Sequence, residues 1–221
     1  AWPGIGRLAI DSALVRDHPD WVLPQVSAGH HWDQDLAAVD ITVPAAASYL
    51  QRVFSTFGEL GIDYFKIDFI YAGALPGRRR GDLAPIPAYR HGLALIREAI
   101  GADAYLLGCG APILASVGCV DAMRVSPDTG LTYQPPSADL SKPAQRSAAM
   151  TGRARAFTHG RWWVNDPDCL VVRPGVERRE EWAAHVERYG GLRASGDRLS
   201  ELDGWGLDVT QRLLSSVPPP V

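Results

Sequence analysis

Residues 61–69 read GIDYFKIDF, and this stretch indicates the fold class. From residue 64 onward it reads as a short buried strand that ends in a charged residue. Period-two alternation places Lys66 and Asp68 on one face of the strand, with Ile67 and Phe69 on the other. A lysine and an aspartate that point into the interior are costly unless they pair or serve a function. The spacing leaves two interpretations open, an ion pair that closes the structure and a functional site.

Segments with helical periodicity alternate with further short apolar runs along the chain. Residues 44–60 place apolar side chains at helical spacing, with Pro44 suited to the first turn and Gly61 to the C-terminal cap. Residues 88–100 repeat this pattern and stop at Gly101. The same periodicities predict helices near 143–156 and 177–189, and strands near 5–10, 104–107, 120–125, 161–164 and 192–194. This alternation predicts βαβ units, a parallel sheet and an α/β fold.

The composition is that of an ordinary globular protein. The chain has 221 residues, of which 46% are hydrophobic and 21% charged, and its formal net charge is -3. This balance argues against a nucleic-acid-binding protein, and no run of about 18 apolar residues predicts a membrane span. The first residues show no basic start followed by an apolar stretch, so no secretory signal is expected and a cytoplasmic location is favoured.

Three further features have simple structural interpretations. The cysteines at 109, 119 and 169 show no CxxC spacing, so we expect buried free thiols rather than a disulfide framework or a zinc site. The basic run 78–80 reads as a solvated loop, with a phosphate site as the alternative. The pair His30-His31 lies near Asp33 and Asp35 and could suggest a metal, but a polar loop is favoured over a metal site.

Side chains able to carry chemistry follow several of the expected strands. In parallel α/β folds, ligands bind at the carboxyl ends of the strands. Asp68 ends one strand, and Cys109 lies between two glycines after the next, either as a small buried residue or as part of a ligand site. Arg124 and Asp128 lie four residues apart across a Ser-Pro turn, where Asp128 could instead form an Asx-turn or a helix cap.

The segment 162–169, WWVNDPDC, adds two carboxylates and an amide after a pair of tryptophans. The indole of Trp163 could stack on the apolar face of a sugar, and packing in the core is the alternative. Asp166 and Asp168 supply the carboxylates. Calcium binding through these oxygens and that of Asn165 is another alternative, although no EF-hand spacing supports it.

Paired carboxylates facing a sugar are what glycoside hydrolysis needs. One must be ionised to attack the anomeric carbon, and the other must be protonated to release the leaving oxygen. Lys66 beside Asp68 favours the ionised form of Asp68 by its opposite charge. Arg124 would favour the ionised form of Asp128 as well, so an acid role for Asp128 requires burial or repulsion from the other carboxylates.

At these residues the sequence resembles the retaining α-galactosidases, the melibiases of glycoside hydrolase families 36 and 27. The matching stretches, in chain order, are DHPDW (17–21), LAAVDITVPAAASYL (36–50), GIDYFKIDF (61–69), YLLGCG (105–110), MRVSPD (123–128), WWVNDPDCL (162–170) and GGLRASGDRLSEL (190–202). The resemblance spans nearly the whole chain. It implies a (β/α)₈ TIM barrel, of which residues 1–215 would hold strands three to eight and residues 216–221 a linker or tail. Because a complete barrel typically takes about 250 residues, we expect an incomplete barrel.

The resemblance also implies the roles of individual residues. Asp68 would be the nucleophile and Asp128 the acid/base. The residues expected to bind the sugar are Lys66, Cys109, Arg124, Trp163, Asp166 and Asp168. No metal or organic cofactor is implied, and the expected partner is an oligosaccharide or another α-galactoside. A second copy of the chain could cover the open edges of an incomplete barrel. We expect burial and the other carboxylates to set the protonation of Asp128.

The sequence also departs from the pattern of that family. The first two barrel strands have no counterpart, and neither have the acidic residues that would hold the outer hydroxyls of the sugar. Residues 4–10, GIGRLAI, match the family's third strand, W-x-A-P-F, poorly. Two alternatives therefore stay open. One is a non-catalytic carbohydrate-binding remnant that keeps Trp162, Trp163, Lys66 and Arg124, and the other is the same chemistry on another α-glycoside, such as an α-N-acetylgalactosaminide.

Overall fold

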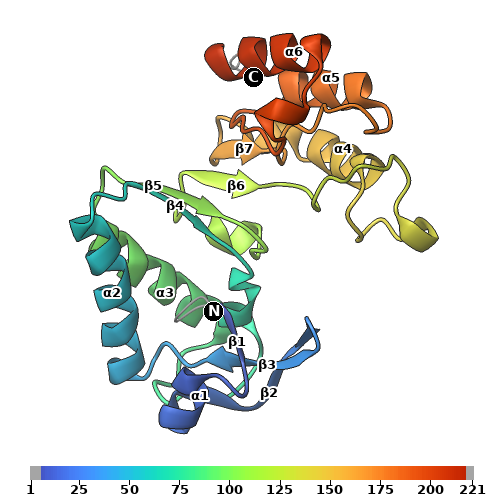
Figure 1. Cartoon of the computed structure of the whole chain (residues 1–221). Coiled ribbons are helices and arrows are strands. Elements are labelled where there is room, and N and C mark those ends of the chain that lie inside the picture. Colours follow the sequence, from blue (N-terminus) through green and yellow to red (C-terminus); the bar gives the residue numbers. More distant parts are fainter. Residues whose placement is uncertain (1–5, 218–221) are drawn as a thin grey trace. The chain divides into compact units, whose positions relative to one another are not determined.

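The computed structural model describes residues 6–217 and divides the chain into two compact units, Ala1–Asp121 and Ala122–Val221 (Figure 1). The prediction of one catalytic domain over 1–215 followed by a tail remains a prediction, and the end of that tail, 218–221, lies outside the described residues. No helix within 6–217 is long and apolar enough to cross a membrane.

The first unit contains a βαβ arrangement around a parallel pair of strands. Strand β4 (Tyr64–Ile67) pairs in parallel with β5 (Tyr105–Gly108), and helix α3 (Pro85–Ile100) connects them. Helix α2 (Pro44–Glu59) precedes β4 and lies beside α3 (Figure 1). The apolar faces of the helices are buried, as the spacing predicts, with Leu50 and Leu93 fully enclosed. These elements confirm the α/β prediction for this unit.

Three ends of helices α2 and α3 follow the predicted signals. Pro44 lies in the first turn of α2, where its missing N–H would have no helical partner. Gly61 follows the end of α2 and Gly101 ends α3, and each has a φ of +82°. A positive φ favours glycine because a Cβ is strained there, so these residues end the helices where the sequence predicts.

A three-stranded antiparallel sheet precedes this βαβ arrangement, and the sequence did not predict it. Its strands are β1 (Arg7–Ala9), β2 (Val22–His31) and β3 (Gln34–Val39), in the order β1-β3-β2. The strand expected near 5–10 therefore exists as Arg7–Ala9, but it pairs antiparallel with β3 and not within a parallel sheet. The prediction therefore placed this strand correctly in the sequence. Its pairing with β3 was missed because β3 is part of a hairpin whose turn the periodicity did not show.

Short helical segments complete the first unit. Helix α1 (Ala13–Asp17) begins at Ser12, whose side chain accepts a hydrogen bond from Val15 N. Turns of 3₁₀ helix cover Pro19–Trp21, Ile70–Ala74 and Leu114–Ser116. The turn at Ile70–Ala74 begins directly after the Lys66–Asp68 motif, so the chain bends sharply where β4 ends.

The basic run 78–80 is not the fully solvated loop that the sequence suggests. Arg79 is 3% exposed, and its guanidinium donates to the carbonyls of Gly73 (2.9 Å) and Leu75 (3.0 Å). The Arg80 backbone N–H donates to Asp40 Oδ2 at 2.7 Å. Burial lowers the pKa of Arg79 from its ordinary value. Arg79 therefore holds the chain after β4 in place, and the interpretation of this run as a solvated loop is wrong for that residue.

The second unit contains another parallel pair. Strand β6 (Ala122–Arg124) pairs with β7 (Val164–Asp166), and α4 (Gln145–Ala154) lies between them in sequence. Helices α5 (Arg179–Tyr189) and α6 (Gly204–Ser215) follow, and short 3₁₀ turns cover Pro136–Ala138, Ala156–Thr158 and Leu199–Glu201. The core consists of fully buried side chains from α5, α6 and the segment after β7, among them Trp182, Val186, Leu170 and Leu213.

Two strand predictions in this unit need correction. The strand expected at 161–164 begins three residues later, at Val164, because residues 160–162 form a turn instead of extended chain. The segment 192–194 is not a strand, and near it only Ser195 forms an isolated bridge, to Leu170. The Arg193 side chain donates to the carbonyls of Glu187 and Leu213, so this segment joins the ends of two helices and does not extend a sheet.

Candidate active site

Asp68 lies immediately after β4, at the carboxyl end of a parallel strand. Its Oδ1 accepts a hydrogen bond from the backbone N–H of Phe69 at 2.6 Å. No hydrogen bond to its Oδ2 is found within residues 6–217. Phe69 has a φ of +54°, an unusual value for a bulky residue, and this turn directs the chain away from the strand at Asp68. The carboxylate is thus fixed through one oxygen while the other can meet a ligand.

The loop after β5 lies against Asp68 and Phe69. The Cys109 N–H donates to Ile67 O, and the Tyr71 N–H donates to Gly110 O, each at 2.8 Å. Gly110 has a φ of +53°, and a Cβ there would lie 3.0 Å from Phe69 Cα and 3.1 Å from Asp68 Oδ1. Only a glycine fits this approach without a shift of the backbone. Gly110 thus reflects close packing at the Asp68 site, the kind of approach that the sequence suggests for this segment.

Lys66 alternates with buried neighbours along β4, as the period-two pattern predicts. Phe65 and Ile67 are buried and Lys66 is exposed. Within the described part of the chain, Lys66 forms no ion pair with Asp68 or with any other carboxylate. The alternative of a structural ion pair between these two side chains is therefore not observed, and the ammonium group can contact a ligand.

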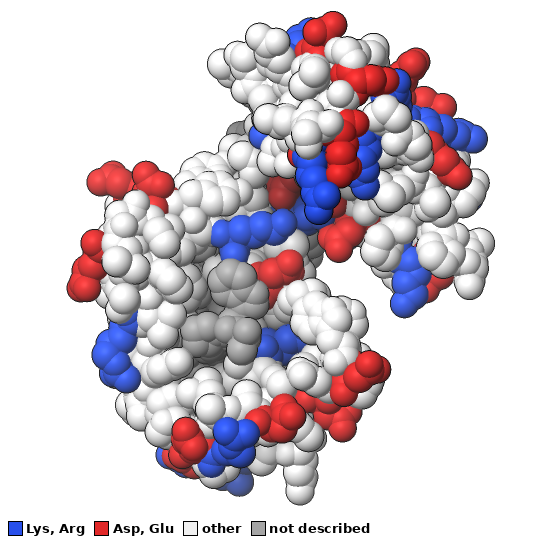
Figure 2. Space-filling view, viewed as in Figure 1, with Lys and Arg blue, Asp and Glu red and all other residues white. Residues whose placement is uncertain are grey.

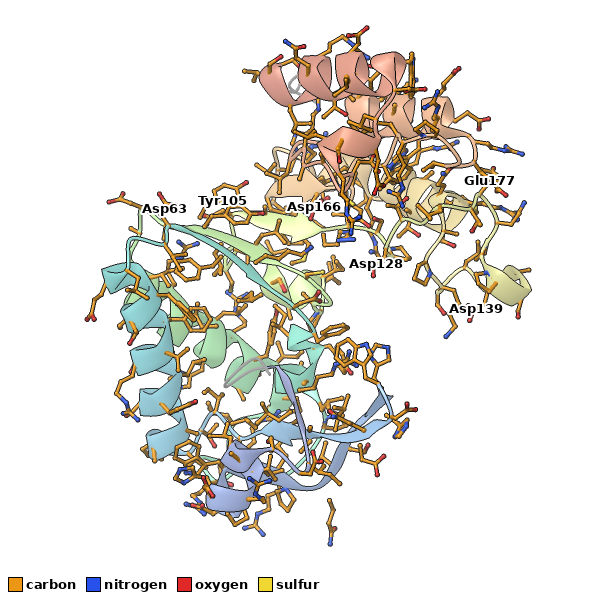
Figure 3. The ribbon with its side chains drawn as sticks, viewed as in Figure 1. Asp63, Tyr105, Asp128, Asp139, Asp166 and Glu177 are labelled. Carbon is orange, nitrogen blue, oxygen red and sulfur yellow. The ribbon has the colours of Figure 1, made fainter. Side chains whose placement is uncertain are left out.

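The second unit brings together Arg124, Asp128 and Asp168. Arg124 ends β6 with 5% of its side chain exposed, and its Nη2 lies 2.5 Å from Asp168 Oδ2 and 2.8 Å from Asp128 Oδ1. Figure 3 shows Asp166 on β7 and Asp128 on the loop after β6. One guanidinium thus holds carboxylates from two loops, a contact between residues 44 positions apart that the motifs alone did not show.

Asp166 and Asp168 also order the loop that follows β7. Asp166 Oδ1 accepts from the Asp168 N–H at 2.9 Å, and Asp168 Oδ1 accepts from the Cys169 N–H at 2.7 Å. Asp168 Oδ2 accepts from the Thr129 N–H at 2.6 Å, in addition to its contact with Arg124. Both oxygens of Asp168 are therefore occupied, so this carboxylate fixes the guanidinium and the neighbouring loop.

Asp128 is not buried, contrary to the sequence-based expectation. Its side chain is 69% exposed, whereas its partner Arg124 is enclosed. The exposure follows from position, since Asp128 lies on the loop beyond the strand end. Its backbone carbonyl accepts from the Ala144 N–H at 3.1 Å, which fixes the loop while the carboxylate reaches solvent.

Trp163 and Asn165 form a buried polar network under β7. Trp163 is 5% exposed and its indole N–H donates to Asn165 Oδ1 at 3.1 Å. Asn165 Oδ1 also accepts from Thr158 Oγ1 at 2.8 Å, and its Nδ2 donates to Arg155 O at 3.2 Å. Burial favours the core-packing alternative for Trp163. The sequence named Asn165 only as a calcium ligand, whereas its amide has a structural role between β7 and the preceding loop.

Cysteines and histidines show no arrangement typical of a metal site. None of these three cysteines forms a disulfide, and only Cys109 is fully buried, while Cys119 and Cys169 are half-buried. Burial raises the pKa of the Cys169 thiol to about 12. His30 Nδ1 lies 2.9 Å from Asp35 Oδ1 across the β2–β3 hairpin. Within residues 6–217, no group of three His, Cys, Asp or Glu side chains could hold a metal ion.

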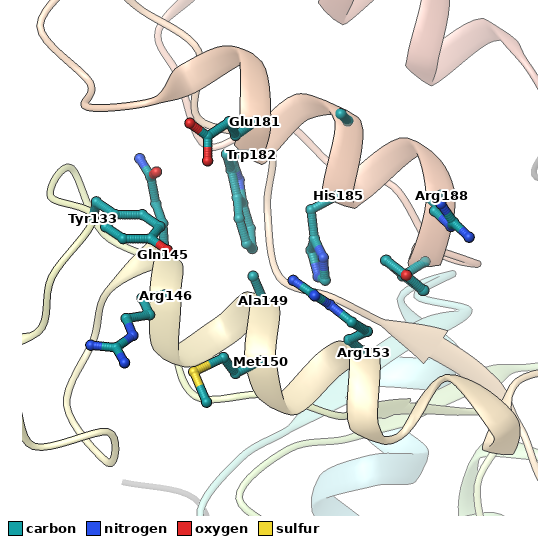
Figure 4. Close-up of a pocket in the computed structure, with 12 residues that line it drawn as sticks. Tyr133, Gln145, Arg146, Ala149, Met150, Arg153, Glu181, Trp182, His185 and Arg188 are labelled. Carbon is teal, nitrogen blue, oxygen red and sulfur yellow. The ribbon is translucent and has the colours of Figure 1, made fainter.

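The second unit also has a pocket of about 350 Å³ between α4 and α5 (Figure 4). His185 stacks on Trp182 there, meets the Tyr189 ring at a tilt and is 7% exposed, and burial lowers its pKa to about 4. This pocket lies between helices and not at the strand ends. Elsewhere, on the face drawn in Figure 2, positive and negative side chains are interspersed over each unit.

Comparison with solved structures places this arrangement among known enzymes. No family model matches the chain. An α-galactosidase from Thermus thermophilus in complex with stachyose is 30% identical, with a TM-score of 0.82, and the match covers 96% of this chain and 48% of that one. The same enzyme in complex with p-nitrophenyl α-D-galactopyranoside gives 29% identity and a TM-score of 0.81, over 96% and 46% of the two chains.

A more distant neighbour shares the fold alone. It is α-galactosidase I from Mortierella vinacea, with 16% identity and a TM-score of 0.58, over 85% of this chain and 48% of that one. The chain thus spans about half the length of the solved chains it matches. The resemblance predicted from the sequence is confirmed: over 96% of its length this chain matches about half of a solved α-galactosidase, as expected of a partial (β/α)₈ barrel.

Proposed function

We propose that this chain carries the catalytic carboxylates of a retaining hydrolase acting on terminal α-galactosides. The observation that carries the proposal is the Asp68 carboxylate, which a backbone N–H fixes at Oδ1 and whose Oδ2 has no hydrogen-bond partner within residues 6–217. A nucleophile needs this combination of fixed orientation and an available oxygen. The bound ligands of the Thermus thermophilus enzyme, stachyose and p-nitrophenyl α-galactopyranoside, support the choice of sugar.

The reaction has two steps. In the first, a lone pair of Asp68 Oδ2 attacks the anomeric carbon, the bond from that carbon to the leaving oxygen breaks, and Asp128 donates a proton to that oxygen. In the second, Asp128 takes a proton from water, whose oxygen attacks the anomeric carbon and releases Asp68. Two displacements on one carbon retain its configuration, and they require the two carboxyl groups to approach within about 5–5.5 Å.

The surrounding residues have supporting roles in this proposal. The Lys66 ammonium donates to a sugar hydroxyl, and Cys109 lines the site beside Gly110. Arg124 holds Asp128 at Oδ1 and leaves the other oxygen for proton transfer. Because the Asp128 side chain is exposed, the proposal requires repulsion from the ionised Asp68, and not burial, to keep its proton in place. Because both oxygens of Asp168 are engaged, we assign it the positioning of Arg124 rather than a contact with sugar. The proposal requires neither a metal nor an organic cofactor.

Replacement of the nucleophile tests this proposal. The Asp68→Ala variant should lose hydrolysis of p-nitrophenyl α-galactopyranoside by a factor on the order of 10⁴ or more, because the covalent route is removed. Added azide should partly restore turnover, since a small anion fits the space of the missing carboxylate. The first product seen by NMR from the unaltered chain should be α-galactose. Release of β-galactose, or no rescue by azide, would contradict the assignment.

A binding measurement addresses the non-catalytic alternative. Calorimetry of galactose binding to the unaltered chain detects a sugar site whether or not turnover occurs. Binding without any release from aryl α-glycosides would favour a carbohydrate-binding remnant. Turnover of the α-N-acetylgalactosaminide instead of the α-galactoside would keep the chemistry and change the sugar.

A further inference from the structure

The tip of the β2–β3 hairpin presents an exposed tryptophan at a strained position. Trp32 and Asp33 are the two central residues of the turn, and both have a positive φ, of 53° and 55°. Such turns favour asparagine or aspartate followed by glycine, because other side chains are strained there. Trp32 is nevertheless 67% exposed. A large aromatic residue that gains little from burial at a strained position indicates a functional role.

The hairpin is anchored to the chain segment that follows Asp68. Tyr71 Oη donates to Ala28 O at 2.9 Å, and Ala72 packs against Ala28, Leu36 and Ala38 of the hairpin. These residues belong to the 3₁₀ turn that begins two positions after the nucleophile and to strands β2 and β3 (Figure 1). The exposed tip is therefore held at a fixed position relative to Asp68.

Aromatic and cationic groups connect Trp32 to the residue next to the nucleophile. The Trp32 and Phe69 rings meet edge to face, with centroids 5.8 Å apart and planes at 86°. The Arg7 guanidinium lies over Phe69, with Cζ 3.5 Å from the ring centroid, and 5.0 Å from that of Trp32. His31 lies 4.2 Å from Trp32 between centroids and accepts a hydrogen bond from Arg7 Nη2 at 3.0 Å. These four residues form the hairpin platform.

The hairpin platform also holds unused hydrogen-bonding capacity. Arg7 Nε is buried without a hydrogen-bond partner, and within residues 6–217 no carboxylate pairs with this guanidinium. An arginine held between aromatic rings and without an acidic partner can donate to hydroxyl groups of a ligand. The exposed indole of Trp32 beside it offers an apolar surface for the C–H face of a sugar ring. Together they match the mixed surface of a hexose.

From this geometry we propose that the hairpin platform binds the leaving-group side of the substrate. The proposal rests on the function proposed above. The galactosyl ring has to place its anomeric carbon at Asp68 Oδ2, among enclosed groups such as Cys109, which is 6% exposed. In an enzyme that removes a terminal sugar, the leaving group is the part that extends toward solvent. The exposed Trp32 lies beside that nucleophile, where the next hexosyl residue of an oligosaccharide would leave the site.

A comparison of two substrates tests this assignment. Stachyose carries a sugar on the leaving-group side, whereas α-galactosyl fluoride carries a single atom there. In Trp32→Ala, the ratio of kcat/KM for stachyose to kcat/KM for α-galactosyl fluoride should fall about tenfold, as expected for the loss of an aromatic stacking contact. Trp32→Phe, which keeps a ring, should restore most of this ratio. Leu60→Ala is the matched control, since Leu60 is 72% exposed at the end of α2 that leads into the start of β4.

Each outcome decides between the platform and the proposed function. If both substrates are hydrolysed and the ratio in Trp32→Ala equals that of the unaltered chain, the platform assignment is refuted while the function stands. An equal loss on both substrates would also refute it, because it would indicate a structural role or a contact with galactose. If the unaltered chain hydrolyses neither substrate, the proposed function fails, and calorimetry decides the platform. Stachyose should then bind more tightly than galactose to the unaltered chain but not to Trp32→Ala. Equal binding of stachyose by these two proteins would refute the assignment.

Discussion

Removal of the Arg124 guanidinium should destabilise the second unit strongly, because it leaves a buried carboxylate without its cation. Asp168 is 12% exposed at its side chain and lies 2.5 Å from Arg124 Nη2. Breaking a buried pair by removing one partner typically costs about 3–5 kcal/mol. Asp168 keeps two backbone donors, Thr129 N and Cys169 N, so the cost should lie near the lower end of that range. The exposed contact with Asp128 adds at most about 1 kcal/mol.

The variant Arg124→Met keeps the length of the side chain and removes the charge. We therefore expect a loss of about 3–4 kcal/mol in the free energy of unfolding, measured by urea denaturation followed by circular dichroism. For a chain of this size, each kcal/mol corresponds to roughly 2–4 °C in Tm, so thermal unfolding should shift by about 6–16 °C. The double variant Arg124→Met/Asp168→Asn removes the unpaired charge and should recover at least about 1 kcal/mol.

A surface ion pair supplies the control. Arg198 pairs with Glu201 at 3.2 Å, but its side chain is 83% exposed, so Arg198→Met should change stability by less than about 0.5 kcal/mol. If Arg124→Met costs no more than Arg198→Met, the reasoning from burial is refuted. If the double variant is less stable than Arg124→Met, Asp168 contributes through its backbone hydrogen bonds and not through an ion pair.

Three further predictions follow from individual residues. Burial lowers the pKa of His185 to about 4, so as the pH falls from about 6.5 to 4 the unfolded chain binds a proton at this residue before the folded chain does, and about 3 kcal/mol of stability should be lost. His185→Gln should flatten this part of the profile of unfolding free energy against pH, and an unchanged slope would contradict the prediction. Gly110→Ala should lower the free energy of unfolding by about 1–2 kcal/mol more than Gly61→Ala does, and should also lower kcat. Both positions have a positive φ, but only at Gly110 would the added Cβ lie 3.0 Å from backbone atoms. Equal losses in urea denaturation would argue against this close approach. Arg79→Met should lower the free energy of unfolding by about 3 kcal/mol in the same measurement, since it leaves several enclosed carbonyls without a hydrogen-bond donor. A change below about 1 kcal/mol would show that water takes the place of the guanidinium as donor.

Local patterns predicted the helices and the strand ends well. Helices α2 and α3 follow from apolar spacing and from Pro44, Gly61 and Gly101, which act on neighbouring residues in the sequence. The order of Asp68, Cys109, Arg124 and Asp128 at strand ends follows from the same local signals. The antiparallel sheet was missed because its pairing depends on the turn at Trp32-Asp33, whose residues carry no standard turn signal.

Local sequence was enough to predict the fold class, the position of Asp68 and Arg124 at the ends of strands, and the motif order that resembles the α-galactosidases. Those properties depend on periodicity and on neighbours a few residues apart. Which side chains meet depends on the tertiary fold. Arg124 contacts Asp168 from 44 positions away, Arg79 is buried among carbonyls, and Trp32 lies against Phe69, the residue next to Asp68. Such contacts depend on the path of the chain through space, because a one-residue change in a turn or a register alters every long-range pair while local periodicity stays the same.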